Sequence, residues 1–71
     1  MKTQNDVFLH VLDHGCHFGW VTTDRSELIS GMISEGLLID REASEGQVSI
    51  KVPKRHISKM LAANIQRVET R

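Results

Sequence analysis

The sequence predicts an α+β domain, and three observations support this class. Apolar residues recur at helical spacing near the N-terminus, in the middle and near the C-terminus of the chain. Between the second and third of these segments, apolar and polar residues alternate around a glycine-containing turn, which is typical of a β-hairpin. The 71 residues are enough for one hydrophobic core, because a chain of this length buries about 60% of the surface that its unfolded form exposes.

The composition indicates a soluble cytoplasmic protein. The single cysteine, Cys16, cannot form an internal disulfide framework, which fits a reducing compartment. No apolar run approaches the roughly 18 residues of a membrane span, and the start MKTQNDVF lacks the apolar core of a signal peptide. We therefore expect one domain over residues 1–71 with no membrane partner.

The N-terminal segment TQNDVFLHVLDHG predicts a helix that Thr3 or Asn5 caps and Gly15 ends. Its apolar residues share one helical face: Val7, Phe8, Val11 and Leu12. The next segment, CHFGWVT, is too short and too rich in glycine for a helix, and we expect a short strand there. Phe18 and Trp20 are expected in the core, because the chain has only three aromatic residues with which to build one.

The segment DRSELISGMISEG predicts a second helix. Asp24 and Glu27 resemble a capping box at its start, and Gly36 stands where a left-handed residue commonly ends a helix. Its apolar residues again share one face: Leu28, Ile29, Met32 and Ile33.

Residues 37–43 and 48–52 predict two strands joined through the turn SEGQ. The alternation of Val48, Ile50 and Val52 predicts the inner face of this hairpin, since a shift of one residue would turn all three toward water. Pro53 ends the second strand because it has no N–H to donate.

The final segment KRHISKMLAANIQRVETR predicts a third, amphipathic helix. We expect its apolar residues to form a single stripe: Ile57, Met60, Leu61, Ile65 and Val68. A domain this small can cover only part of that stripe, so we predict a homodimer through this helix. The alternative is that the helix packs entirely on its own domain, with Leu61 and Ile65 against Val11 or Trp20.

The segment LISGMISEGLLIDREASEGQVSIKV resembles the end of the recognition helix and the wing of bacterial winged helix-turn-helix regulators. Both have an apolar helix that ends at a glycine, two apolar residues that open a strand, a charged tip with a glycine, and a return strand. The resemblance implies a compact winged-helix-like domain with an extra C-terminal helix, and a small DNA-binding transcriptional regulator. The chain differs from this family in residues 15–23, which leave no room for a complete additional helix.

The resemblance also suggests which residues contact DNA. Arg25, Ser26, Ser30 and Ser34 would face the groove and Arg41 would lie in the wing, whereas the phosphate contacts would come from Lys51, Lys54, Arg55 and Lys59. The charge distribution agrees in part. Up to Gly46 the chain has eight acidic and three basic residues, whereas six basic residues and one acidic residue follow. A polyanion should therefore prefer the C-terminal third.

The acidic residues leave a second function open. Asp24, Glu27 and Glu35 on the second helix, with further acids in the hairpin, are unfavourable for contact with phosphate. The same domain could instead be a protein-interaction module that regulates or inhibits a larger protein. Such a module would use the acidic helix and hairpin, or the C-terminal helix.

The segment HVLDHGCH contains the residues most suited to chemistry. His10 and His14 lie one helical turn apart, with Cys16 and His17 just beyond, and zinc takes such ligands. Four ligands within eight residues would strain the turn at Gly15, so we expect surface histidines rather than a metal site. Cys16 and His17 are neighbours in sequence, which rarely point at one another, and we expect neither a cofactor nor catalysis.

Overall fold

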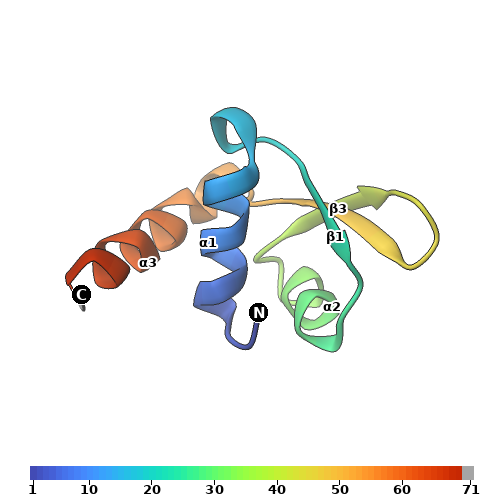
Figure 1. Cartoon of the computed structure of the whole chain (residues 1–71), viewed down its shortest axis with the longest axis horizontal. Helices are drawn as coiled ribbons and strands as arrows, with labels where there is room; N and C mark the ends of the chain where they lie inside the picture. The colour runs from blue at the N-terminus through green and yellow to red at the C-terminus, as the bar shows by residue number, and fades with distance from the viewer. Residues whose placement is uncertain (70–71) are drawn as a thin grey trace.

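The computed structural model describes residues 1–69. It contains three α-helices, three strands and two short 3-10 turns: α1 (Gln4–His14), η1 (Cys16–Phe18), β1 (Val21–Asp24), α2 (Glu27–Ser34), β2 (Ile39–Glu42), β3 (Gln47–Lys51), η2 (Lys54–His56) and α3 (Ile57–Glu69). In Figure 1, α1 lies between α3 on one side and the sheet with α2 on the other. The α+β class and the order of helix, strand, helix, hairpin and helix are confirmed.

Helix α1 begins with the cap expected from Thr3. The backbone N–H of Asp6 donates to the Thr3 hydroxyl (3.2 Å), and the Asp6 carboxylate accepts from the backbone N–H of Thr3 (3.0 Å). These two bonds form a capping box. The helix ends at Gly15 as predicted, although Gly15 is not left-handed. A Cβ at this position would lie 2.6 Å from the Val11 carbonyl oxygen, so only glycine fits.

The strand expected over CHFGWVT is wrong for residues 16–20. Cys16–Phe18 forms the turn η1, which the backbone N–H of Gly19 closes by donating to the Cys16 carbonyl (2.9 Å). His17 and Phe18 both have left-handed backbone angles, with φ of 53° and 59°. Strand β1 therefore starts only at Val21.

The cap of α2 also differs from the prediction. The Ser26 hydroxyl accepts the backbone N–H of Ile29 (3.2 Å), whereas Asp24 belongs to β1 and pairs with Gln47. Asp24 cannot cap α2 because its backbone is part of the sheet. The end of α2 is as expected, since Gly36 is left-handed with φ of 79°.

The hairpin β2–β3 and strand β1 form an antiparallel sheet in the order β1-β3-β2. The inner face predicted for β3 is confirmed, because Val48, Ile50 and Val52 are all buried. Residues on this central strand alternate, so Ser49 and Lys51 point to the opposite, outer face of the sheet. All four residues of the edge strand β2 are exposed.

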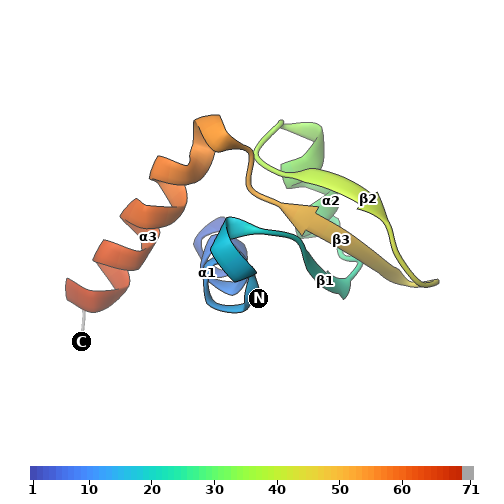
Figure 2. The same cartoon turned by 90° about the horizontal axis from the view of Figure 1, so that it is seen from above.

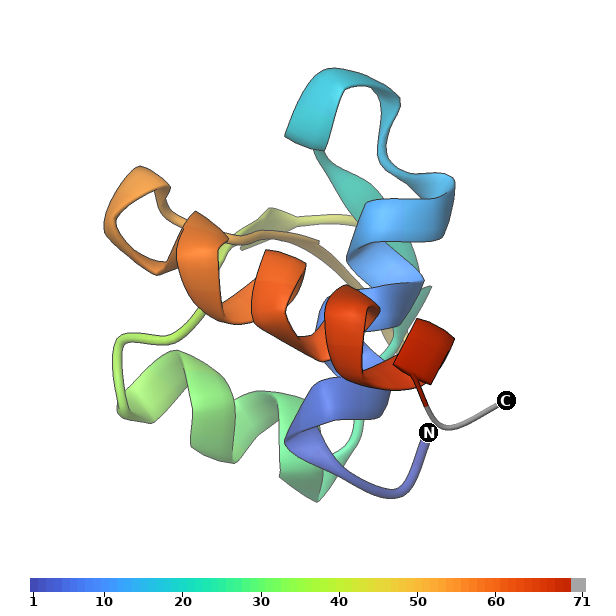
Figure 3. The same ribbon diagram turned by 90° about the vertical axis from the view of Figure 1, so that its left-hand side faces the viewer.

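The core lies between the inner face of the sheet and the helices α1, α2 and α3. Figure 2 shows α1 at the end of the sheet with α3 crossing on its far side, and Figure 3 shows α3 lying across α1. Helix α3 contributes Met60 and Ala63 to this core. No helix within residues 1–69 is long and apolar enough to cross a membrane.

Candidate nucleic-acid interface

The side chain of Trp20 lies on the outer face of the sheet and not in the core as predicted. The guanidinium carbon of Arg41 lies 4.4 Å from the Trp20 ring centroid, and Lys51 Nζ lies 5.9 Å from it. Because β1 and β2 flank β3, a ring that starts at the β1 edge and contacts Arg41 of β2 must lie across β3. Trp20 is accordingly half-buried.

Two of the predicted DNA contacts therefore surround an aromatic ring. A cation held over the face of a tryptophan gains about 0.5–1 kcal/mol at an exposed site. This contact keeps the long Arg41 side chain against the sheet.

A hollow of about 490 Å³ adjoins Lys51 on the same side of the molecule. Residues from η1, β2, β3 and the η2 region line it: His17, Phe18, Ile39, Lys51, Val52, Pro53, Lys54, Arg55 and Ile57. Phe18 remains 40% exposed at its edge, so the core position predicted for this residue is wrong. The left-handed turn η1 carries the ring away from the core.

We call the basic and aromatic residues of this region, together with the apolar Ile39 between them, the basic–aromatic surface: His17, Phe18, Trp20, Ile39, Arg41, Lys51, Lys54 and Arg55. Within residues 1–69, none of its lysines and arginines forms an ion pair with a carboxylate. Arg55 donates one hydrogen bond to the Gly36 carbonyl oxygen (3.1 Å), which orients the guanidinium and leaves its other N–H groups for a ligand. Lysine and arginine side chains are thus grouped here without an ion-paired carboxylate.

The other predicted DNA contacts lie elsewhere. Ser30 and Ser34 are exposed on α2, which packs on the inner face of the sheet, opposite to Trp20, and Arg25 is exposed between β1 and α2. Ser26 is occupied as the cap of α2. Helix α2 also exposes Glu27 and therefore presents a mixed polar surface.

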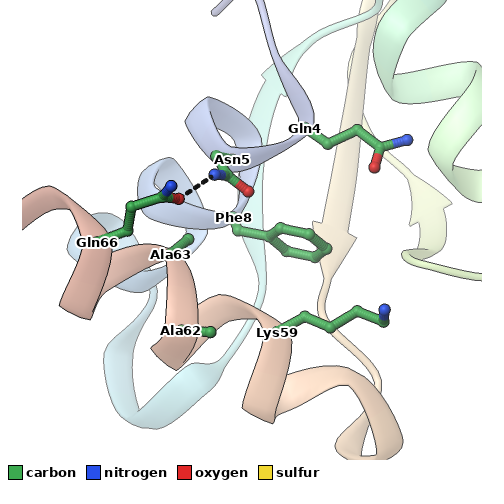
Figure 4. A pocket seen from close by; sticks show the side chains of 7 residues that line it. All are labelled: Gln4, Asn5, Phe8, Lys59, Ala62, Ala63 and Gln66. Carbon is green, nitrogen blue, oxygen red and sulfur yellow. Dashed lines mark hydrogen bonds between the residues drawn. The ribbon is translucent and has the colours of Figure 1, made fainter.

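Lys59 lines a different hollow, of about 440 Å³, between α1 and α3. Figure 4 shows the Phe8 side chain between the two helices, with Lys59 beside it. The Asn5 amide donates to the Gln66 side chain (3.0 Å) across this hollow. The structure therefore separates Lys59 from the basic–aromatic surface.

A salt bridge between Arg67 and Asp13 connects the C-terminal end of α3 to α1. Arg67 donates two hydrogen bonds to the Asp13 carboxylate, of 2.8 and 3.2 Å. These bonds lower the pKa of Asp13 below its usual range and raise that of Arg67. The contact fixes α3 on the body of the domain.

The histidines near the end of α1 stack on one another, with ring centroids 4.3 Å apart. His14 Nδ1 lies 3.0 Å from the His10 carbonyl oxygen, so that nitrogen is directed at the helix backbone. Burial lowers the pKa of His10, and the nearby His14 lowers it further. Within residues 1–69, no group of three or more His, Cys, Asp or Glu side chains is placed to hold a metal ion.

The apolar stripe predicted on α3 is divided between two faces. Met60 is fully buried and Ile57 is half-buried against the core, but Leu61, Ile65 and Val68 are 40%, 58% and 62% exposed. The alternative in which Leu61 and Ile65 pack on their own domain is therefore wrong. These three residues, spaced i, i+4 and i+7, form what we call the α3 stripe.

Sequence reasoning missed the contribution of Trp20 and Phe18 to the basic–aromatic surface. Their neighbours in sequence are not lysines or arginines, and the basic residues that surround them come from segments more than twenty positions later. The available signal was the alternation in the predicted hairpin, which places Ile39 and Arg41 on one face of their strand. Only the register shows that Lys51 pairs with Ile39 on that face.

Comparison of the chain with protein-family models gives no match, and neither the curated proteins nor the solved structures include a significant match. Function is therefore inferred from the surface of the chain itself.

Proposed function

We propose that this domain binds nucleic acid through the basic–aromatic surface. The observation that supports this most strongly is the grouping of Arg41, Lys51, Lys54 and Arg55 around Trp20 and Phe18 without carboxylate partners. Neutralisation of phosphates by such cations supplies most of the sequence-independent affinity for nucleic acid. The winged-helix resemblance of residues 28–52 makes duplex DNA the expected target and transcriptional regulation the expected role.

The four cations have different parts in this proposal. Lys51 and Lys54 act as mobile point charges toward phosphates. Arg41 is oriented by Trp20 and Arg55 by the Gly36 carbonyl, so both guanidinium groups are held before the ligand arrives. Preorientation lowers the entropy that is lost on binding.

The salt dependence of duplex binding tests the phosphate contacts. Each contact removed lowers the slope of log K against log salt by about 0.9 on B-DNA. Lys54→Ala is the primary variant, because the Lys54 side chain forms no hydrogen bond or ion pair within the described residues, so its removal leaves the fold in place. Fluorescence anisotropy with a labelled generic duplex at several salt concentrations gives the slope.

Lys59→Ala is the matched control. It removes the same charge from an exposed lysine that lines the other hollow, so the slope is expected to stay as in the wild type. Equal slopes for all three proteins, or a reduced slope for Lys59→Ala alone, would contradict the placement of the phosphate surface.

A second pair of variants separates this surface from the groove-facing helix of the winged-helix family. Ser30→Glu and Ser34→Glu add negative charge to the exposed side of α2, away from Trp20. If α2 entered the major groove, each would weaken duplex binding strongly through repulsion of the phosphates. We expect small effects, because the proposed contacts lie on the opposite face of the sheet.

A second candidate function is self-association through the α3 stripe, which retains the predicted homodimer. Exposed Leu61, Ile65 and Val68 form a contiguous apolar row of the kind that marks interaction sites. In an antiparallel pair of α3 helices, Leu61 would face the Val68 position of the other copy. The same helix thus supplies a self-complementary apolar seam for a second copy of itself.

Sedimentation at micromolar concentration tests this association. The wild type is expected to show the mass of two chains, and Ile65→Asp the mass of one. Ile65 is 58% exposed, so its substitution spares the fold. A wild type that sediments as a single chain would refute the dimer and would favour a different protein on the α3 stripe.

A further inference from the structure

The hollow beside Phe18 combines two kinds of lining that serve different parts of one ligand. Phe18, Ile39 and Ile57 supply aromatic and aliphatic walls. His17, Lys51, Lys54 and Arg55 supply cationic or protonatable groups around them. An entirely apolar ligand would form no ion pair with the basic side chains. A phosphate ion alone would leave the apolar side chains exposed to solvent.

The backbone holds the Phe18 ring in this position. His17 and Phe18 are consecutive non-glycine residues with positive φ, which bulky side chains rarely adopt. The result is a phenyl ring that is 40% exposed in a chain with only three aromatic residues for its core. Strained backbone of this kind commonly occurs at ligand-binding sites.

We infer that this hollow binds one unpaired nucleotide, whose base stacks on the Phe18 ring and whose phosphate is bound by Lys54 and Arg55. A nucleotide is the anion that also carries a planar apolar group, and aromatic side chains flanked by cations are the usual platform for it. The inference rests on the proposed nucleic-acid function and narrows its target. Bases in a duplex are stacked on one another, so only a single-stranded end or junction can supply a base to Phe18.

The arrangement explains why the hollow adjoins the rest of the basic–aromatic surface. Lys51 lines the hollow and also lies 5.9 Å from the Trp20 ring, which carries Arg41 on its face. A strand that leaves a duplex held at Arg41 would pass Lys51 and reach Phe18. The preferred ligand is therefore DNA in which duplex and single strand meet.

The test compares three labelled DNAs with the full chain by fluorescence anisotropy: a blunt duplex, the same duplex with a single-stranded extension of about six thymidine nucleotides, and the single strand alone. The wild type is expected to bind the extended duplex most tightly. Phe18→Ala is expected to weaken binding to the extended duplex by about 5- to 150-fold, which corresponds to the stacking of one base, and to weaken binding to the blunt duplex much less, so that the preference for the extended duplex is lost.

Two further variants separate stacking from apolar contact. Phe18→Trp keeps an aromatic ring and should retain the preference for the extended duplex, whereas Phe18→Leu keeps apolar bulk without the ring and should lose it. Alanine, tryptophan and leucine are not β-branched, so each is expected to tolerate the positive φ of residue 18 about as well as phenylalanine does. Circular dichroism and urea unfolding show whether each variant keeps the wild-type fold.

The outcomes distinguish the two proposals. If all three DNAs bind with normal salt dependence and the Phe18 variants bind like the wild type, the nucleotide site is refuted and nucleic-acid binding stands. If no DNA binds, both proposals fail. Binding of mixed phosphatidylcholine and phosphatidylserine vesicles that depends on Phe18, with no dependence of DNA binding on it, would assign the hollow to a lipid surface and overturn the inference.

Discussion

Met60→Ala and Leu61→Ala are expected to have very different effects on the stability of one chain, although the two residues are neighbours on α3. Met60 is 0% exposed and packs in the core, whereas Leu61 is 40% exposed at the start of the α3 stripe. A rotation of about 100° per residue along a helix separates them onto different faces. The pair therefore reports how α3 is rotated about its own axis.

The expected magnitudes follow from burial. Truncation of a fully buried methionine to alanine removes its transfer free energy and leaves a cavity, which together cost about 2–5 kcal/mol. A chain of 71 residues has a free energy of unfolding of about 4–11 kcal/mol. Met60→Ala therefore removes a large share of the stability. Leu61→Ala costs about 1 kcal/mol or less, because no cavity forms and alanine favours the helix.

Urea unfolding followed by circular dichroism measures both effects, at protein concentrations low enough for the single chain to predominate. The midpoint for Met60→Ala is expected to fall well below that of the wild type, and the midpoint for Leu61→Ala to stay close to it. The proposed dimer would add stability to the wild type at high concentration, and Leu61→Ala would lose that gain. Equal losses for the two variants at low concentration would refute the observed orientation of α3.

Three further predictions concern local interactions. Arg67 lowers the pKa of Asp13, so the pair stabilises the fold above the unfolded pKa of about 3.9, and this contribution disappears as the pH falls through the lower folded pKa. Acid titration of Asp13→Asn should therefore show a weaker loss of stability in that range than the wild type shows. Ser26→Ala should lower the free energy of unfolding by about 1 kcal/mol through loss of the α2 cap, and Asp24→Ala by less, as thermal unfolding would show. Gly36→Ala should lower it by about 1 kcal/mol or more, because φ of 79° disfavours a side chain; an unchanged urea midpoint would contradict this.

Prediction from the sequence was most successful where the signal is local. The cap at Thr3, the left-handed residue at Gly36 and the inner face of Val48 and Ile50 each depend on residues within one turn or one strand. It was wrong at Asp24, because the competing sheet pairing with Gln47 lies more than twenty residues away. The cap then passed to Ser26, which is free of the sheet.

The candidate site could be predicted only in part for the same reason. Lys51, Lys54 and Arg55 were predicted as phosphate contacts from the resemblance and from the charge of the C-terminal third, and the structure places these three residues around one hollow. Phe18 and Trp20 were assigned to the core, because apolar residues are usually buried. Phe18 is exposed because of the backbone angles of the turn η1, and Trp20 is half-buried because it lies across the sheet. The spacing of residues in the sequence predicts neither feature.

The sequence by itself determined the three helices, the hairpin and the order in which they follow one another, because periodicity, caps and turn residues act over a few neighbouring positions. The tertiary structure alone decided which side chains meet from distant segments. Trp20 reaches Arg41 because β3 lies between β1 and β2, and Met60 rather than Leu61 enters the core because α3 crosses α1 at one particular rotation. Both outcomes depend on how whole helices and strands pack together. The free energy that favours one packing over another is the sum of many small contacts in the core, and no short stretch of sequence contains it.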